Sequence, residues 1–320
     1  VDKVPALAID AGAGTGKTTT LVEIAKRLPP GRGRLFCAFN KDIVRELEDR
    51  LDGTGMVAKT FHSLGYSALA KKLNVKLKLD GDKFKTIIQK WFKTDDAIKL
   101  RQAINHAVDH TEKILPVAEQ EAMLYDQCNR IMREVTRFLR LKLIEWDDED
   151  RLHWLIDYYN MVEPTDPEVT EEMIDCIVRA VPSIMKIAED KAKMNAEIDF
   201  TGMIYWAVRW NLWVFQNEIV FVDECQDLSP MQRSIVAKAL KKNGRIILVG
   251  DPSQAIYEFA GADSNSFEIS VKWFKAKVMP LSVTRRCDTV IAYHAAQLKP
   301  GFRPVEGTDR GKIVWIDEGR

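Results

Sequence analysis

The stretch AGAGTGKT, from Ala11 to Thr18, combines small residues with a lysine–threonine pair at the spacing of a phosphate-binding loop. It departs from that pattern once, because Ala11 stands where the first glycine belongs. In such a loop the backbone N–H groups surround the phosphates, and the N-terminus of the next helix adds its partial positive charge. We expect Lys17 to reach the β- and γ-phosphates and the Thr18 hydroxyl to ligate Mg²⁺. A dinucleotide fingerprint does not fit, because Lys17 occupies the place of its third glycine.

Two neighbouring acids follow a second apolar segment. The four residues Ile219–Val222 are typical of a buried strand, and they lead directly into Asp223 and Glu224. Such a strand would deliver Asp223 to its carboxyl edge, where the carboxylate can hold Mg²⁺ through water. Glu224 is then placed to act as general base on the attacking water. The alternative is a pair of solvated acids in a loop, but the apolar strand in front of them favours triphosphate hydrolysis.

A third segment, GDPSQAIYEFAGA, follows the apolar run Ile246–Val249. Its strand would end at the same crevice, so that Gln254 could touch the γ-phosphate or the attacking water. Tyr257 and Phe259 follow at alternating positions. Such aromatic residues usually belong to a core, but beside a nucleotide site they also serve as stacking platforms for unpaired bases. Both interpretations of the two rings stay open.

The segments that flank these candidate residues alternate between strand-like and helix-like patterns. Strand-like and helix-like runs follow one another around the loop and again from Glu218 onward, which predicts a parallel α/β sheet. Between Lys71 and Met194 the strand-like runs vanish and helical periodicity dominates, so we predict a helical insertion in the α/β domain. A further α/β unit is predicted after Phe259, with a strand at KVMPL and a helix from Asp288 to Leu298.

The composition restricts the classes of partner and compartment. Basic and acidic residues each number 47, so the net charge is zero and a polyanion partner would need a local basic surface. Eight lysines against two aspartates between Lys71 and Lys93 form either a solvated helical face or such a surface. No apolar run approaches the roughly 18 residues of a membrane span, and the five scattered cysteines form no C-x-x-C pair. We therefore expect a cytoplasmic, reducing compartment and no membrane partner.

A series of segments, taken together, resembles one family. The segments AGAGTGKT, AFNKD, TFHS, DFTGM, DECQDLSPMQ, GDPSQAIYEFAGA and LSVTRRC occur in the order found in the UvrD/Rep/PcrA-like superfamily 1 DNA helicases. The resemblance covers nearly the whole chain except the helical insertion. DECQD with Gln232 downstream and GDPSQAIYEFAGA are specific to that family, whereas the phosphate loop alone is not.

The resemblance implies a RecA-like P-loop NTPase fold with a helical insertion and the beginning of a second RecA-like domain. We expect the first RecA-like domain at residues 1–70 and 195–262. The insertion, an accessory DNA-binding subdomain, is expected at residues 71–194. Residues 263–320 would begin the second domain, which we expect to be incomplete because the later motifs, with a second arginine finger, are absent by Arg320. We expect the natural protein to continue.

The resemblance also assigns roles to side chains beyond those given above. Gln254 resembles the residue that couples the γ-phosphate state to the bound strand, and Arg286 resembles the arginine that the second domain offers to the γ-phosphate. The expected nucleotide contacts are Ala11, Gly12, Ala13, Gly14, Thr15, Gly16, Lys17, Thr18, Thr19, Arg285 and Arg286. The expected Mg²⁺ ligands are Thr18 and Asp223. The expected DNA contacts are Phe39 and Asn40, the backbone of Thr60, Phe61 and His62, and the stacking pair Tyr257 and Phe259. Asp199 in DFTGM matches an acidic position that is expected to be structural.

Three departures from the family concern the base of the nucleotide. Relatives hold a glutamine upstream of the loop, and nothing before Val4 supplies it. Thr19 stands where an arginine is common. Arg285 stands where a tyrosine helps to sandwich the base, although an arginine can itself stack. The sequence therefore predicts a triphosphate site without predicting its selectivity for adenine.

The resemblance implies an ATP-dependent DNA helicase or translocase that uses Mg²⁺ and acts on single-stranded DNA and single-strand/duplex junctions. Relatives move 3′ to 5′, but no residue here fixes the direction or excludes RNA. A monomer is expected, with protein partners in replication or repair. Two alternatives stay open: a DNA-stimulated translocase without unwinding activity, and a nucleotide-switched DNA-binding module with negligible hydrolysis.

Overall fold

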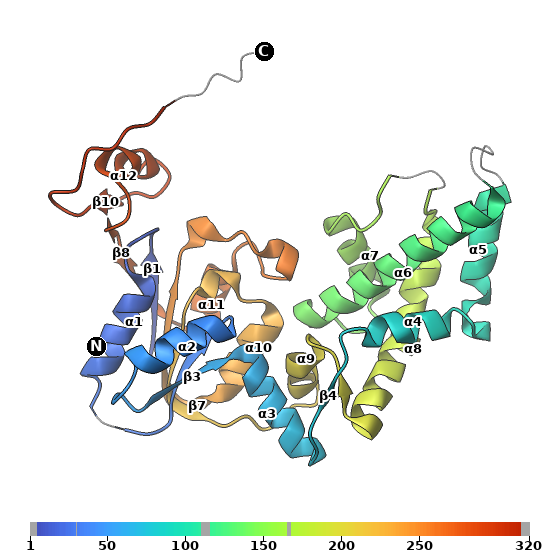
Figure 1. Ribbon diagram of the computed structural model, residues 1–320, viewed down its shortest axis with the longest axis horizontal. Coiled ribbons are helices and arrows are strands. Elements are labelled where there is room, and N and C mark those ends of the chain that lie inside the picture. The colour runs from blue at the N-terminus through green and yellow to red at the C-terminus, as the bar shows by residue number, and fades with distance from the viewer. Residues whose placement is uncertain (1–4, 30, 110–115, 165–167, 315–320) are drawn as a thin grey trace. The chain divides into compact units, whose positions relative to one another are not determined.

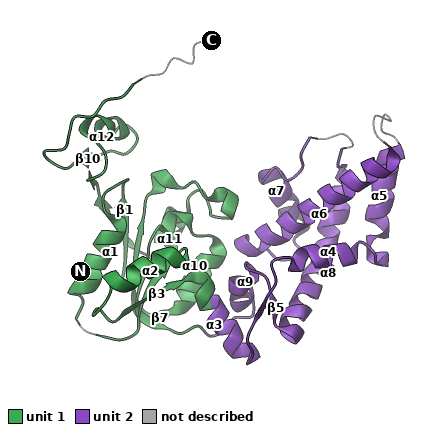
Figure 2. Cartoon of the chain, in the orientation of Figure 1, with its two compact units in different colours: residues 1–64, 214–320 green, residues 65–213 purple. Residues whose placement is uncertain are grey.

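Figure 1 shows the computed structural model of the chain, which describes residues 5–29, 31–109, 116–164 and 168–314. The chain divides into two units, which Figure 2 colours separately: residues 1–64 with 214–320, and residues 65–213. Every residue for which the sequence predicts a nucleotide, magnesium or DNA contact lies in the first of these units. The first unit is therefore the one whose fold bears on the chemistry.

Six parallel strands form the central sheet in the described part of the first unit, in the order β3-β2-β6-β7-β1-β8. They are β1 (Ala6–Ala11), β2 (Arg34–Ala38), β3 (Met56–Thr60), β6 (Asn217–Val222), β7 (Leu240–Gly250) and β8 (Lys277–Leu281). Strand β2 is buried along its whole length, as expected of a parallel strand covered on both faces. The predicted α/β class with a parallel sheet is confirmed.

Helices α1 (Lys17–Arg27) and α2 (Lys41–Arg50) pack on this sheet through apolar side chains at helical spacing. Their buried residues form one core with side chains from the strands: Leu21, Val22, Ala25, Leu47, Phe36, Phe221 and Val249. Helices α10 (Pro230–Ala239) and α11 (Ser266–Phe274) follow β6 and β7 in the chain. Helix α10 begins at a capping box, in which the Ser229 N–H donates to Gln232 Oε1 and the Gln232 N–H donates to Ser229 Oγ. This contact gives Gln232 a structural role at the start of α10.

The register of the central strands places their carboxyl ends along one edge of the sheet. Val222 of β6 pairs with Cys37 of β2 and with Leu248 of β7, and Gly250 of β7 pairs with Asp10 of β1. The segments that follow these parallel strands therefore start from the same edge. The phosphate-binding loop, the acids after Val222 and the turn after Gly250 are brought together by this register.

The second unit is mainly helical. Its helices are α4 (Lys83–Trp91), α5 (Ile98–Asp109), α6 (Val117–Lys142), α7 (Glu149–Tyr158), α8 (Glu171–Asn195) and α9 (Gly202–Arg209), and α3 (Phe61–Leu73) runs into it from the first unit. The unit extends beyond the predicted insertion, 71–194, at both ends. One reason is that β5 (Glu197–Ile198) pairs with β4 (Lys78–Leu79). Another is that Gly65 of α3 lies so close to Met203 of α9 that a Cβ would stand 2.2 Å from the Met203 carbonyl oxygen.

The run of lysines between Lys71 and Lys93 is not one uniform face. Seven of its eight lysines, all within the described residues, are exposed, but Lys83 is fully buried. The Lys83 ammonium donates to the carbonyl oxygens of Ala188 and Glu197 at 2.8 and 2.7 Å, and burial lowers the pKa of Lys83 to about 8. Lys83 thus joins α4 to α8 and β5. The exposed lysines suit either a solvated face or a nucleic-acid surface.

The structure differs from the predicted boundary at residue 263. Strand β8 adds to the first sheet beside β1, with Ile9 opposite Met279, so residues up to Leu281 still belong to that sheet. After Leu281 a separate two-stranded sheet is formed by β9 (Val283–Thr284) and β10 (Arg303–Pro304), with α12 (Thr289–Ala295) between them in sequence. Within the described residues no helix has both the length and the apolar character needed to cross a membrane.

The segment after β8 is attached to the carboxyl edge of the first sheet. The Lys299 ammonium lies 2.7 Å from a carboxylate oxygen of Asp10, at the end of β1, and 2.7 Å from one of Asp251, directly after β7. Asp251 is buried, and Phe302 is buried against Gly12, where a Cβ would come within 2.6 Å of its ring. Lys299 therefore offsets the repulsion between two carboxylates and holds this segment on the sheet.

Replacing Lys299 by Met should loosen this attachment, because it leaves a buried carboxylate without its cation. Since Lys299 and Asp10 are partly exposed, we expect a loss of about 1–3 kcal/mol in the free energy of unfolding, less than the roughly 3–5 kcal/mol for a fully buried pair. Urea unfolding measures the loss. Lys272→Met, at an exposed position of α11, is the matched control, and equal unfolding free energies of the two variants would contradict the assignment.

Candidate active site

The phosphate-binding loop connects β1 to α1 and depends on two glycine conformations. Gly14 and Gly16 have φ values of 67° and 87°, in the left-handed region that disfavours other residues. The Thr15 side chain and backbone N–H both donate to the Gly12 carbonyl oxygen, at 2.8 and 3.3 Å, and close the loop. Ala11 is fully buried at the end of β1, so the residue that departs from the glycine pattern belongs to the strand. The loop therefore has the turn that phosphate binding requires.

The side chains predicted to act on phosphate and water meet at the start of α1. The Thr18 hydroxyl donates to Asp223 Oδ2 at 2.5 Å. The Lys17 ammonium lies 3.3 Å from Glu224 Oε2 and donates to Gln254 Oε1 at 3.4 Å. The structure thus brings together residues from positions 17–18, 223–224 and 254, as the sequence predicts.

Glu224 adopts an unusual backbone conformation at the end of β6. Its φ of 50° lies in the left-handed region, where a residue with a side chain costs about 1–3 kcal/mol unless the surroundings hold it. Its backbone N–H donates to Asp223 Oδ1 at 3.0 Å, which helps to hold the turn. Strained residues of this kind are concentrated at functional sites, and Glu224 is the predicted general base.

Burial and mutual repulsion change the acidity of two carboxyl groups at this edge. Burial raises the pKa of Asp223 to about 6, although the hydrogen bond from Thr18 acts in the opposite direction. Burial and the nearby charge of Glu224 raise the pKa of Asp227 to about 6. Lys17 supplies positive charge to this acidic cluster. A second cation would therefore be stabilised beside it.

The donor set at this edge fits Mg²⁺, the cofactor that the sequence predicts. A carboxylate of Asp223 and a hydroxyl of Thr18 are hard oxygen ligands, and they lie in contact with each other. Mg²⁺ keeps several waters and takes one or two protein oxygens in nucleotide sites. These two side chains are therefore the ones that would hold it.

Arg285 and Arg286 belong to the segment after β8, and their backbone lies against the loop. The Arg285 N–H donates to the Gly14 carbonyl oxygen at 2.9 Å. A Cβ on Gly14 would stand 2.2 Å from Arg286 Cβ, so only glycine allows this approach. Both arginine side chains are exposed. The structure thus brings the backbone of the predicted finger, Arg286, to the loop.

The predicted DNA contacts near α2 and α3 are partly structural. Asn40 Oδ1 accepts from the Ile43 N–H and caps α2, while Thr60 Oγ1 accepts from the Ser63 N–H at the start of α3. Phe61 is fully buried and packs edge-on against the half-buried ring of Phe39. Burial lowers the pKa of the next residue, His62, to about 4. The Phe61 side chain is therefore unavailable to a strand, so any contact at that residue is made by its backbone.

Tyr257 and Phe259 are exposed on the surface that follows Gln254. Their side chains are 46% and 66% exposed, and their ring centroids lie 5.7 Å apart at an angle of 36°. The interpretation as core residues is therefore wrong. Two exposed rings in the segment that follows the predicted nucleotide contact Gln254 instead favour the interpretation as a stacking platform.

Asp199 lies in the second unit, where it forms a buried ion pair. Arg140 Nη1 of α6 donates to Asp199 Oδ2 at 2.6 Å. The same guanidinium donates to the Thr136 carbonyl oxygen and lies over the ring of Phe84. This arrangement gives Asp199 a structural role in joining the DFTGM segment to α6.

The sequence did not single out Gln226 as a functional residue. Its side chain lies between the acidic turn and the start of the turn after β7, and it is almost fully buried. The signal that points to it is its place directly inside DECQD, between two carboxylates that must be held apart.

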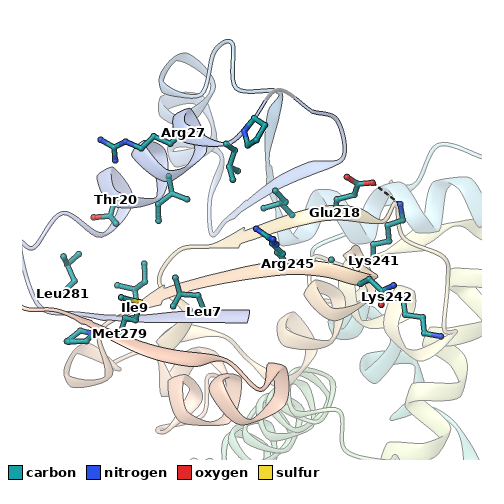
Figure 3. A pocket seen from close by; sticks show the side chains of 17 residues that line it. Leu7, Ile9, Thr20, Arg27, Glu218, Lys241, Lys242, Arg245, Met279 and Leu281 are labelled. Carbon is teal, nitrogen blue, oxygen red and sulfur yellow. Dashed lines mark hydrogen bonds and ion pairs between the residues drawn. The ribbon is translucent and has the colours of Figure 1, made fainter. Parts of the chain in front are cut away.

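A separate cavity of about 1050 Å³ lies beside α1 (Figure 3). Apolar side chains from α1 and the residue after it, and from strands β1, β6 and β8, line it: Leu7, Ile9, Ile24, Leu28, Ile219, Met279 and Leu281. Charged side chains stand at its end near residues 241–245, where Lys241 pairs with Glu218 at 3.1 Å. None of the predicted nucleotide contacts lines this cavity, so it is distinct from the catalytic cluster.

Comparison with known proteins agrees with this geometry. The family model of the UvrD/REP helicase N-terminal domain matches residues 5–274. DNA helicase IV of Escherichia coli (strain K12) is 25% identical over 98% of this chain and 49% of its own length. F-box DNA helicase 1 of Gallus gallus is 25% identical over 82% of this chain and 23% of its own length. DNA helicase II of Haemophilus influenzae is 24% identical over 96% of this chain and 39% of its own length.

The chain spans about half the length of these relatives or less. The family model, in contrast, matches most of the chain, including the loop, the acidic turn and the segment with Gln254. The chain therefore belongs to the UvrD/REP helicase family.

Proposed function

We propose that this chain forms the ATP-hydrolysing part of a DNA helicase, which couples Mg-ATP hydrolysis to movement along single-stranded DNA and to duplex unwinding. The observation that carries the proposal is the contact of Lys17 with both Glu224 and Gln254, because Gln254 lies only a few residues before the exposed rings of Tyr257 and Phe259. A nucleotide site and a base-stacking surface thus share one short segment.

Binding of the triphosphate would rearrange the charges around Lys17. The loop N–H groups and the N-terminus of α1 would hold the phosphates, and Thr18 and Asp223 would hold the metal. When bound, Mg²⁺ supplies positive charge at the β- and γ-phosphates. Lys17 would then turn from Glu224 to the phosphates, which carry more negative charge than one carboxylate. Glu224 would be left free to accept a proton from the attacking water.

The segment after β8 would complete the site. Its backbone already contacts Gly14, and the exposed guanidinium of Arg286 would approach the γ-phosphate by a movement of its side chain. A guanidinium at that position stabilises the charge that develops in the transition state. Thr19 and Arg285 would lie next to the base, and adenine selectivity would then depend on them.

Movement along DNA would follow from the link between Gln254 and the two rings. Loss of the γ-phosphate would remove the partner of Gln254 and shift the segment that carries Tyr257 and Phe259 along the unpaired bases. Single-stranded DNA and single-strand/duplex junctions are the proposed substrates, with 3′ to 5′ movement by a monomer. The named relatives are DNA helicases, which supports DNA as the substrate.

Steady-state ATP hydrolysis with and without single-stranded DNA tests this function. We expect DNA to stimulate the wild type, and both Lys17→Ala and Glu224→Gln to lose turnover by roughly 100-fold or more, since general bases contribute about 10²–10⁴-fold. Equal rates for the wild type and Glu224→Gln would overturn the role of this carboxylate. A wild type that binds nucleotide but shows no stimulation would instead indicate a nucleotide-switched binding module.

Alanine substitutions test the stacking platform. Tyr257→Ala and Phe259→Ala should each weaken binding of an oligo(dT) strand by about 1–3 kcal/mol, because each removes one aromatic face. Fluorescence anisotropy measures the affinity. Ile256→Ala is the matched control, because Ile256 is 69% exposed in the same segment but offers no ring. A loss of affinity in Ile256→Ala as large as in the two ring variants would count against stacking.

A further inference from the structure

Gln226 is a buried amide whose polar atoms are all engaged by the nucleotide site. It lies in the short turn η2 (Cys225–Asp227) and is 3% exposed. Its Nε2 donates to Glu224 Oε2 at 3.0 Å and to Asp227 Oδ2 at 2.9 Å. Its Oε1 accepts from the Asp251 N–H at 3.0 Å. One side chain therefore contacts the predicted base and the first residue after β7.

The end of β7 is shaped to receive this amide. A Cβ on Gly250 would stand 2.6 Å from Gln226 Oε1 and 2.9 Å from Cys225 Sγ. Gly250 does not have a positive φ, so the backbone conformation does not require glycine here. The close approach of Gln226 is what requires it.

Beyond Asp251 the contacts lead to the segment that would touch DNA. The Asp251 carboxylate accepts from the Ser253 N–H at 3.1 Å and so holds the turn η3 (Pro252–Gln254). Gln254 in turn accepts from Lys17. A continuous set of hydrogen bonds thus runs from Glu224 through Gln226 and Asp251 to the turn that precedes Tyr257.

We propose that Gln226 is a positioning residue that couples strand binding to hydrolysis. It orients the Glu224 carboxylate toward the attacking water and ties that orientation to the position of residues 251–259. When Tyr257 and Phe259 bind bases, the turn after β7 becomes fixed in position. Its Asp251 N–H then holds the Gln226 amide by a hydrogen bond, and the amide holds the Glu224 carboxylate in place. This inference rests on the proposed function. It identifies Gln226 as the contact through which DNA would stimulate ATP hydrolysis.

The chemistry of glutamine suits this role better than other side chains of its size. An amide donates and accepts at the same time, so it can satisfy two carboxylates and one N–H. A glutamate would bring a further negative charge against Glu224 and Asp227. A methionine fills the space without any of the three hydrogen bonds.

The test compares the turnover number for ATP with and without saturating oligo(dT) in Gln226→Met. We expect the DNA-stimulated turnover number to fall by about tenfold or more, because small displacements of a catalytic group carry such losses. The KM for ATP and the affinity for oligo(dT) should change by less than about threefold, because the loop and the two rings are unaltered. A merely structural role would lower stability and both affinities together.

Two further variants keep the test decisive. Ile235→Val removes one methylene from a fully buried side chain of α10 and should cost about 0.5–1.5 kcal/mol of stability while keeping the DNA stimulation. Gly250→Ala displaces the amide without removing any polar group and should reproduce the loss seen in Gln226→Met. If Gln226→Met and Gly250→Ala keep the wild-type stimulation, the inference fails while the proposed function stands. If the wild type itself shows no stimulation, the proposed function fails as well.

Discussion

The parallel register of β1, β6 and β7 is the constraint on which the site depends. Gly250 lies opposite Asp10, and Val222 lies opposite Leu248, so three strands that are far apart in sequence end at the same edge. Each apolar strand is stabilised by burial on both faces, which fixes the register against slippage. The polar residues that follow the strands do not form part of the sheet. The register of the strands nevertheless determines which of these residues lie close together.

What meets at this edge is an excess of negative charge. Asp223 and Asp227 lie near Glu224, and the pKa values of the two aspartates are raised to about 6. A carboxyl group with a raised pKa binds its proton more tightly in the folded chain, so its ionisation costs stability as the pH rises through about 6. At neutral pH a cation at Thr18 and Asp223 would offset this cost. A cation bound at this edge would therefore relieve both the burial of these carboxylates and the repulsion between them.

The local patterns of the sequence predict the site more fully than the fold around it. The loop, the acids after Val222 and the segment with Gln254 are each recognisable within a few residues, because each follows an apolar strand of its own. Contacts between distant segments left no such pattern. The pairing of β8 with β1 was missed because KVMPL is a strand whose neighbour cannot be read from five residues.

The burial of a single residue within a polar stretch could not be predicted from the sequence either. Lys83 stands among exposed lysines but is fully buried, since it is the one that reaches two carbonyl oxygens of α8 and β5. Gln226 escaped notice because its three partners come from two strand ends, and only the register brings them to one amide.

We propose that the nucleotide site and the stacking surface are energetically coupled through this edge of the sheet. The most direct measurement is the affinity of the protein for a fluorescent oligo(dT), with and without a non-hydrolysable Mg-ATP analogue, together with the affinity for the analogue with and without the DNA. Linkage requires the two effects to be equal, and we expect a common factor of about fivefold or more. Affinities for DNA that are the same with and without nucleotide would contradict it.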